Sequence, residues 1–344
     1  MSKLAYLLIA TFSFLFTASM NLCGEKGEAG TELDFLTLGV GARPCAMGGS
    51  FISISDDANA SYWNPGGLVQ VGTPQITGMH TDLDFGTSYD YVSCATPLSK
   101  DVLEMKTADS YDNVIGFAFI RTATGDIPIT QAGDDTIPGT NYTEIVYKGT
   151  AHFTASSYLF SYGRRITDWF SFGLTGKIVD MGLYTHNGTG YGLDMGILLR
   201  KSGSRNPLLS NLSLGILIQD LTVTKINWDT DYTDEISPAV KGGITYRFFG
   251  ASAPGGWVPE EGICLTVEGA QQIKTERQED WHKPEIHLGC EWKLVNLVPL
   301  RVGWDNGNLT AGIGFITKHI CVDYGFVSHE ELKTTHRIGL TLRM

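Results

Sequence analysis

The sequence is poor in charge and has no apolar run long enough for a membrane-spanning helix. Charged residues make up 18% of the chain, below the roughly 25% of typical soluble domains. The main apolar run, Leu4 to Phe16, is shorter than the roughly 20 residues that a spanning helix needs. The formal net charge is −12, whereas nucleic-acid binding requires a basic surface. These deficits argue against a helical membrane protein and against a nucleic-acid partner.

Motifs for catalysis, cofactors and metals are also missing. The chain has no GxSxG, HExxH, P-loop or dinucleotide fingerprint. Its eight histidines show no metal-ligand spacing, and its six cysteines form no CxxC pair. Six cysteines allow 15 pairings, among which the sequence does not choose. We therefore predict no enzymatic activity, no cofactor and no metal site, and we favour the cysteines as small residues of strands and loops.

Residues 1–20 have the pattern of a secretory signal peptide. Lys3 provides the positive end, Leu4 to Phe16 the apolar region, and Thr17 to Ser19 the small residues before cleavage. Cys23 raises the alternative of a lipoprotein, but Leu22 stands where a small residue is expected. The sequence predicts an exported protein with its signal peptide removed.

Glycine, aromatic residues and alternating strands are abundant instead. Glycine accounts for 41 of 344 residues and aromatics for 11%, against an average glycine content of about 7%. From residue 74 onward the hydrophobic period is two. In Glu285 to Leu294, for example, Ile286, Leu288 and Cys290 alternate with charged neighbours. A soluble sandwich also alternates, but here one face carries almost no charge over some ten strands. This predicts an apolar face toward lipid and a polar face toward a lumen.

The predicted fold is an all-β transmembrane antiparallel barrel of about 14 strands, over residues 73–344. An even number fits single-chain bacterial barrels. The predicted strand centres are Ile76, Val92, Phe117, Ser157, Leu174, Met195, Ile216, Ile244, Val267, Leu288, Val302, Ile313, Val322 and Leu340.

Four longer polar stretches are predicted to be loops on one side of the barrel. They are Thr122–Tyr147, Lys225–Ser237, Phe249–Glu261 and Lys274–Pro284, all rich in Asp, Thr, Gly or Pro. The first is long enough for a role in gating or partner contact, although a solvated loop is the simpler interpretation.

Before the strands lies a small element that we predict to be a hatch or plug, within residues 21–72. Its core is Gly41 to Leu68. We expect a short strand over Phe51 to Ser55, a helix start capped by Asp56 or Asp57, and a stop at Asn64 in the left-handed conformation. The candidate hatch residues are Gly48, Gly49, Asp56, Asp57, Asn64, Pro65 and Gly66.

The polar faces of the strands supply the candidate lumen residues. The alternation places Asp194, Lys241, Arg247, Glu268 and Glu291 inward. A route for hydrophobic molecules needs a continuous apolar lining, so these charges favour a role other than transport. A one-residue register slip at a bulge would reverse the assignment.

Both ends of the chain resemble the PorV/PorQ proteins of the FadL-like outer-membrane superfamily. The N-terminal resemblance rests on Gly41-Ala42-Arg43, Met47-Gly48-Gly49, Asp56-Asp57-Ala58 and Asn64-Pro65-Gly66-Gly67-Leu68. The C-terminal one rests on Leu309 to Phe315, Val322 to Phe326 and Thr335 to Ile338. Gly66-Gly67 departs from the commoner Ala-Gly.

This resemblance implies a 14-stranded outer-membrane barrel whose N-terminal hatch folds into or beneath the lumen. It further implies a type IX secretion component that binds the C-terminal domains of cargo proteins and passes them to surface attachment machinery. The alternative is a FadL-like channel for long-chain fatty acids or other hydrophobic small molecules. A structural barrel without a ligand is a third, weaker reading. The expected partners are the outer-membrane bilayer together with type IX cargo or hydrophobic small molecules.

Overall fold

A computed structural model describes residues 34–98, 113–136, 143–200, 207–248, 262–273, 284–294, 297–328 and 334–344. The predicted signal peptide, Cys23 and the first part of the predicted hatch lie outside these residues. Among the described residues, no helix has the length and apolar character needed to cross a membrane. Within the same ranges, no three His, Cys, Asp or Glu residues are grouped to hold a metal ion.

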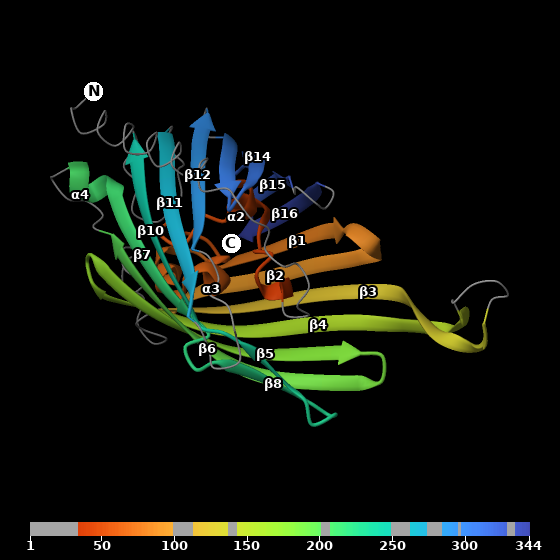
Figure 1. Ribbon diagram of the computed structural model, residues 1–344. Helices are drawn as coiled ribbons and strands as arrows, with labels where there is room; N and C mark the ends of the chain where they lie inside the picture. Colours follow the sequence, from red (N-terminus) through yellow and green to blue (C-terminus); the bar gives the residue numbers. More distant parts are fainter. Residues whose placement is uncertain are drawn as a thin grey trace.

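The described chain forms a closed antiparallel β-barrel of 14 strands (Figure 1). The wall strands are β1 Gln75–Leu83, β2 Thr87–Leu98, β3 Asn113–Thr136, β4 Thr143–Thr167, β5 Phe170–Leu183, β6 His186–Arg200, β7 Leu212–Gln219, β10 Ala239–Phe248, β11 Gly262–Gln272, β12 Glu285–Leu294, β13 Val298–Asp305, β14 Asn308–Ile316, β15 Ile320–Val327 and β16 Thr335–Arg343. Neighbours in this order pair with each other, and β1 pairs with β16 to close the ring. Every predicted strand centre lies in one of these strands, so the predicted fold class is confirmed.

Alternation along each strand separates an outer apolar face from an inner polar one. In β16 the buried Thr335, Arg337 and Thr341 alternate with the exposed Ile338 and Leu340. Exposed apolar side chains recur around the barrel on the other strands in the same way. A wide outer band of this kind is suited to lipid contact. Because β16 pairs with both β15 and β1, the described wall has no open sheet edge at this strand.

Two predicted loops are largely strand. Of Thr122–Tyr147, residues 122–136 belong to β3 and residues 143–147 to β4, and these two paired strands extend beyond the other strands (Figure 1). The loop prediction was wrong because Thr, Ile and Val pair across β3 and β4 despite interspersed Asp and Gly. Lys225–Ser237 contains the hairpin β8 Thr224–Trp228 and β9 Thr233–Ile236, and β8 pairs with β6. Phe249–Glu261 and all of Lys274–Pro284 except Pro284 lie outside the described residues.

The part of the hatch that is described, residues 34–72, lies inside the barrel (Figure 1). It consists of short elements: η1 Asp34–Leu36, α2 Ala42–Ala46, α3 Ala60–Trp63 and η2 Pro65–Gln70. The remaining short elements are η3 Asp84–Gly86, between β1 and β2, and α4 Pro207–Asn211, before β7.

The predicted strand over Phe51 to Ser55 is wrong. The Phe51 carbonyl accepts bonds from the amides of Ile54, at 3.1 Å, and Ser55, at 2.8 Å, so the chain turns there. All neighbouring wall strands are already paired with each other. Local turn bonds therefore satisfy this buried backbone instead of a sheet edge.

Candidate functional site

The hatch is pressed against the wall backbone on the β12–β15 side. Gly48 has a φ of +66°, and a Cβ at this position would lie 2.6 Å from the Trp304 amide nitrogen. Gly49 has a φ of +71° and lies against the Trp63 ring. Both residues therefore have the left-handed conformation that glycine adopts without cost. At Gly48 a side chain would also collide with the wall backbone.

Glycines of the wall make the matching space. The wall glycines whose Cβ would meet hatch atoms within 3.1 Å are Gly116, Gly163, Gly173, Gly196, Gly215, Gly289, Gly303, Gly312, Gly325 and Gly339. These glycines come from strands all around the barrel. The high glycine content thus serves close backbone contact between the wall and the hatch.

Asn64 joins the hatch to itself and to the wall. Its side-chain nitrogen donates to the Ile52 carbonyl at 2.8 Å and to the Ile197 carbonyl of β6 at 3.0 Å. Its side-chain oxygen accepts from the Gly66 amide at 3.0 Å and so caps η2, with Pro65 as the first residue. Helix α3 ends at Trp63, so the predicted stop at Asn64 is confirmed. The predicted left-handed conformation is wrong, because Asn64 has an extended backbone with φ −168°.

We expect Asn64→Ala to loosen the hatch. The substitution leaves the buried Ile52 carbonyl and the part-buried Ile197 carbonyl without this donor, and an unpaired buried group costs about 1–3 kcal/mol. Single-channel recordings in planar bilayers should show more frequent open events than wild type. Asn187→Ala, at an exposed position of β6, is the matched control. Conductance unchanged in both variants would contradict a retaining role for Asn64.

Arg43 is the centre of a buried charge cluster. Its guanidinium holds Glu291 of β12 through Nε–Oε2 at 2.9 Å and Nη2–Oε1 at 3.1 Å. Nη1 binds Asp56 at 2.6 Å and Asp57 at 3.0 Å. Two-point contacts between Arg and a carboxylate are among the stronger ion pairs. Glu291 in turn pairs with Arg301 of β13 at 2.8 Å. The cluster therefore ties both hatch carboxylates to the wall.

Opposite charges outweigh the effect of burial on the pKa of Arg43 and Asp56, but not on the pKa of Asp57. Burial alone would lower the pKa of Arg43, but Asp56, Glu291 and Asp57 outweigh it and raise this pKa well above its usual range. Burial would likewise raise the pKa of Asp56, yet the charges of Arg43, Arg247 and Lys293 lower it to about 2. The pKa of Asp57 stays raised, chiefly by burial. The main partner of both carboxylates is Arg43. Of the predicted helix cap, the structure shows one hydrogen bond, which the Asn59 amide donates to Asp57 at 2.9 Å.

The other candidate lumen residues lie on the inner wall but do not form one site. Asp194 pairs with Lys177 at 3.0 Å, and Glu268 accepts from the Ser53 amide at 3.0 Å. Arg247 donates to the Ser213 hydroxyl at 3.3 Å, and Lys241 lines a cavity described below. Asp194, Glu268 and Glu291 are therefore engaged by the wall or the hatch. Because these carboxylates already have partners, their presence in the lumen does not argue against an apolar route for hydrophobic molecules.

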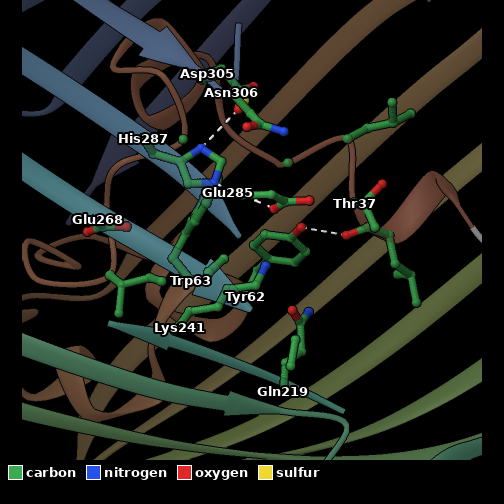
Figure 2. Close-up of a pocket in the computed structure, with 18 of the residues that line it drawn as sticks. Thr37, Tyr62, Trp63, Gln219, Lys241, Glu268, Glu285, His287, Asp305 and Asn306 are labelled. Carbon is green, nitrogen blue, oxygen red and sulfur yellow. Dashed lines mark hydrogen bonds and ion pairs between the residues drawn. The ribbon is translucent and has the colours of Figure 1, made fainter. Parts of the chain in front are cut away.

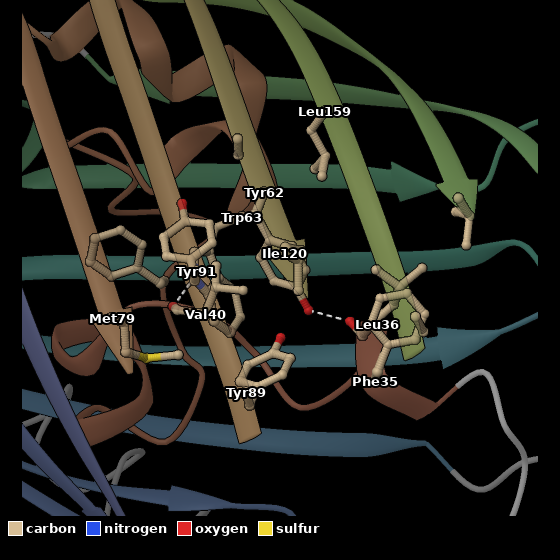
Figure 3. Packing of buried hydrophobic residues seen from close by; sticks show 14 of the residues in the cluster. Phe35, Leu36, Val40, Tyr62, Trp63, Met79, Tyr89, Tyr91, Ile120 and Leu159 are labelled. Atoms are coloured by element: carbon tan, nitrogen blue, oxygen red, sulfur yellow. Dashed lines mark hydrogen bonds between the residues drawn. The ribbon is translucent and has the colours of Figure 1, made fainter. Parts of the chain in front are cut away.

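On the opposite side of the lumen the inner wall is apolar. Met79, Tyr91, Ile120 and Val179 occupy neighbouring register positions across β1 to β5, interrupted by Ser157. Together with adjacent inward residues they form what we call the apolar wall: Met79, Tyr89, Tyr91, Ala118, Ile120, Ala155, Leu159, Val179, Met181 and Ile226. Phe35 and Leu36 of the hatch pack against it (Figure 3). Sequence analysis missed this wall, although Met, Tyr and Ile at inward strand positions were its signal.

A cavity of about 260 Å³ lies between part of the hatch and inner residues of β10 to β14. Trp63 and Tyr62 of the hatch border it, as do Lys241, Glu268 and Glu285 of the wall (Figure 2). His287 projects between Glu285 and Asp305, with Nδ1 at 2.9 Å from Asp305 (Figure 2). The lumen thus holds a mixed polar cavity on one side of the hatch segment and the apolar wall on the other.

Solved structures of two toluene transporters share this fold. The chain superposes on the Pseudomonas putida toluene transporter TodX with a TM-score of 0.56 and 12% identity, over 88% of this chain and 96% of that one. The fold is FadL-like. The superposition on the Ralstonia pickettii toluene transporter TbuX has a TM-score of 0.52 and 12% identity, over 89% of this chain and 98% of that one. The superposition on a deltaS2 mutant of the TodX monoaromatic hydrocarbon channel has a TM-score of 0.53 and 11% identity, over 90% of this chain and 98% of that one.

At these identities the likeness shows the FadL-like barrel fold and leaves the ligand open. No protein-family model matches the chain. No curated protein matches it either. The PorV/PorQ resemblance therefore remains a resemblance of the two terminal segments.

Proposed function

We propose that this protein is an outer-membrane channel for hydrophobic small molecules, closed at rest by its N-terminal hatch. The observation that carries the proposal is the apolar wall, which runs across the inner faces of β1 to β5 and continues to β8. Ligand sites for hydrophobic molecules have such linings, with few polar groups placed among them. The shared fold of TodX and TbuX supports the same assignment.

The charges of the lumen then have a retaining role. Arg43, Asp56, Asp57 and Glu291 fasten the hatch to β12, and the wall glycines let its backbone approach closely. Displacement of the hatch would open a path along the apolar wall. The type IX reading rests on the terminal resemblance alone, and the fold comparisons support the channel better than cargo binding.

Uptake of a small aromatic hydrocarbon tests the channel. Cells that produce the protein should accumulate radiolabelled toluene several-fold faster than cells with empty vector. Ile120→Asn, which places an amide in the fully buried apolar wall, should lower this uptake toward the vector level, because a desolvated polar group disfavours an apolar ligand.

The matched control is Ile244→Asn on the outer face, where the side chain is 54% exposed. Heat-modifiable gel migration shows whether each variant is folded. Uptake by wild type equal to that of empty vector would overturn the proposed function. Equal uptake by folded wild type and Ile120→Asn would remove the apolar wall from the route.

A further inference from the structure

Three buried donors lie side by side on the inner wall next to the hatch. Arg337 of β16 is the register partner of Thr81 of β1, which is the partner of Tyr89 of β2. Adjacent strands are about 4.8 Å apart, so the three side chains project into the same part of the lumen. Their exposures are 3%, 1% and 0%.

Each of these side chains has a polar atom without a hydrogen-bond partner among the described residues. The atoms are Arg337 Nε, Thr81 Oγ1 and the Tyr89 hydroxyl. Buried polar atoms are paired in the great majority of cases, because an unpaired one costs free energy. Three such atoms at neighbouring register positions point to an acceptor that is supplied from outside the chain.

Arg337 also differs from the other buried cations of the lumen. Arg43, Arg301 and Lys177 each contact at least two carboxylates. Arg337 has no carboxylate at ion-pair distance within the described part of the chain. Its Nη2 donates to the Leu38 carbonyl at 2.8 Å, and its Nη1 to the Gly39 carbonyl at 2.9 Å and to Cys45 Sγ at 2.7 Å. A buried guanidinium held by neutral acceptors favours an anion.

The hatch segment Phe35 to Gly39 fills the space beside these donors. The side chains of Phe35 and Leu36 pack in the cluster that contains Tyr89 and Ile120 (Figure 3). Further along the segment, the carbonyls of Leu38 and Gly39 accept hydrogen bonds from the Arg337 guanidinium. On its other side the segment borders the cavity, which Leu36, Leu38 and Arg337 help to line. The segment therefore places one aromatic ring, one branched chain and two oxygen acceptors in this region.

We propose that Arg337, Thr81 and Tyr89 form a subsite for the carboxylate of an aromatic monocarboxylate, whose ring lies against the apolar wall in place of Phe35. The proposal rests on the proposed channel function and specifies its ligand class. A carboxylate supplies the missing negative charge and accepts from Arg337 Nε and the two hydroxyls. Without a ligand, the Phe35–Gly39 segment binds Nη1 and Nη2 of Arg337, and its Phe35 side chain packs in the cluster with Tyr89. The ring of the ligand and the Phe35 side chain therefore compete for the same place on the apolar wall.

Isothermal titration of the full-length protein in detergent tests this subsite, with phenylacetate and toluene as probes. Wild type should bind phenylacetate more tightly than toluene. Tyr89→Phe retains the ring, so it should fold, and it should weaken phenylacetate binding about tenfold, the size of a lost hydrogen bond to a charged group. Toluene binding should stay unchanged. The matched control is Tyr158→Phe, which removes a hydroxyl from a half-buried tyrosine on the opposite face of the wall.

The double variant Phe35→Ala/Leu36→Ala removes the internal competitor and should tighten phenylacetate binding. Arg337→Gln should abolish the preference for phenylacetate over toluene. If toluene binds and phenylacetate binds no better, or if Tyr89→Phe leaves phenylacetate binding unchanged, the subsite is overturned while the channel stands. If neither compound binds and toluene uptake also fails, the proposed function itself is wrong.

Discussion

Replacing Arg43 with alanine is expected to convert the closed barrel into one that conducts ions. Arg43 contacts Asp56, Asp57 and Glu291, so its loss leaves two buried carboxylates and the half-buried Asp56 without their shared cation. Removing one partner of a buried ion pair costs about 3–5 kcal/mol. Because each 1.4 kcal/mol is tenfold in an equilibrium, the open fraction of the hatch should rise by roughly two to three orders of magnitude. Single-channel conductance in planar bilayers measures this.

The control for Arg43 is an equivalent truncation elsewhere. Arg121→Ala removes an exposed arginine from β3 and should leave the conductance at the wild-type level. In the double variant Arg43→Ala/Glu291→Ala the wall carboxylate is gone as well, so part of the closure should return. A closed Arg43→Ala channel in a correctly folded barrel would show that the charge cluster does not retain the hatch.

Placing a side chain at Gly303 should displace the hatch by steric contact. A Cβ at this position would lie 2.3 Å from the Gly48 nitrogen and 2.4 Å from the Met47 carbonyl carbon. Both atoms belong to the Met47–Gly48 peptide of the hatch backbone, so no side-chain movement relieves the contact in a close-packed interior. We expect Gly303→Val to keep the barrel and lose the docked hatch. The conductance should rise, and the Gly41–Leu68 segment should become sensitive to added protease.

Gly176→Val is the matched control for this substitution. Gly176 is also a strand glycine, in β5, but a Cβ there meets no atom within 4 Å. Both variants add the same β-branched side chain, which strands accept readily. If the hatch resists protease equally in Gly303→Val and in Gly176→Val, it is not closely docked at β13.

The barrel itself could be predicted from the sequence because its determinants are local. Each wall strand alternates between lipid-facing and inward residues, and a period of two is visible over as few as eight residues. The run Thr335 to Arg343 shows this without any tertiary contact. The alternation also assigned Glu291 and Glu268 to the inner face, where they are buried. The prediction was wrong where a polar composition concealed strand pairing, as in the paired strands β3 and β4, part of which was predicted to be a loop.

The interior depended on contacts between residues far apart in the chain. No local pattern joins Arg43 to Glu291, 248 positions away, or Arg337 to the Gly39 carbonyl, 298 positions away. The same holds for Phe51 to Ser55, which forms a turn because no free strand edge is available inside the closed wall. Strand period, and with it the barrel, was determined by the sequence alone. Which inward residues hold the hatch and which form the apolar wall was decided only by barrel closure, because closure sets the register that brings them together.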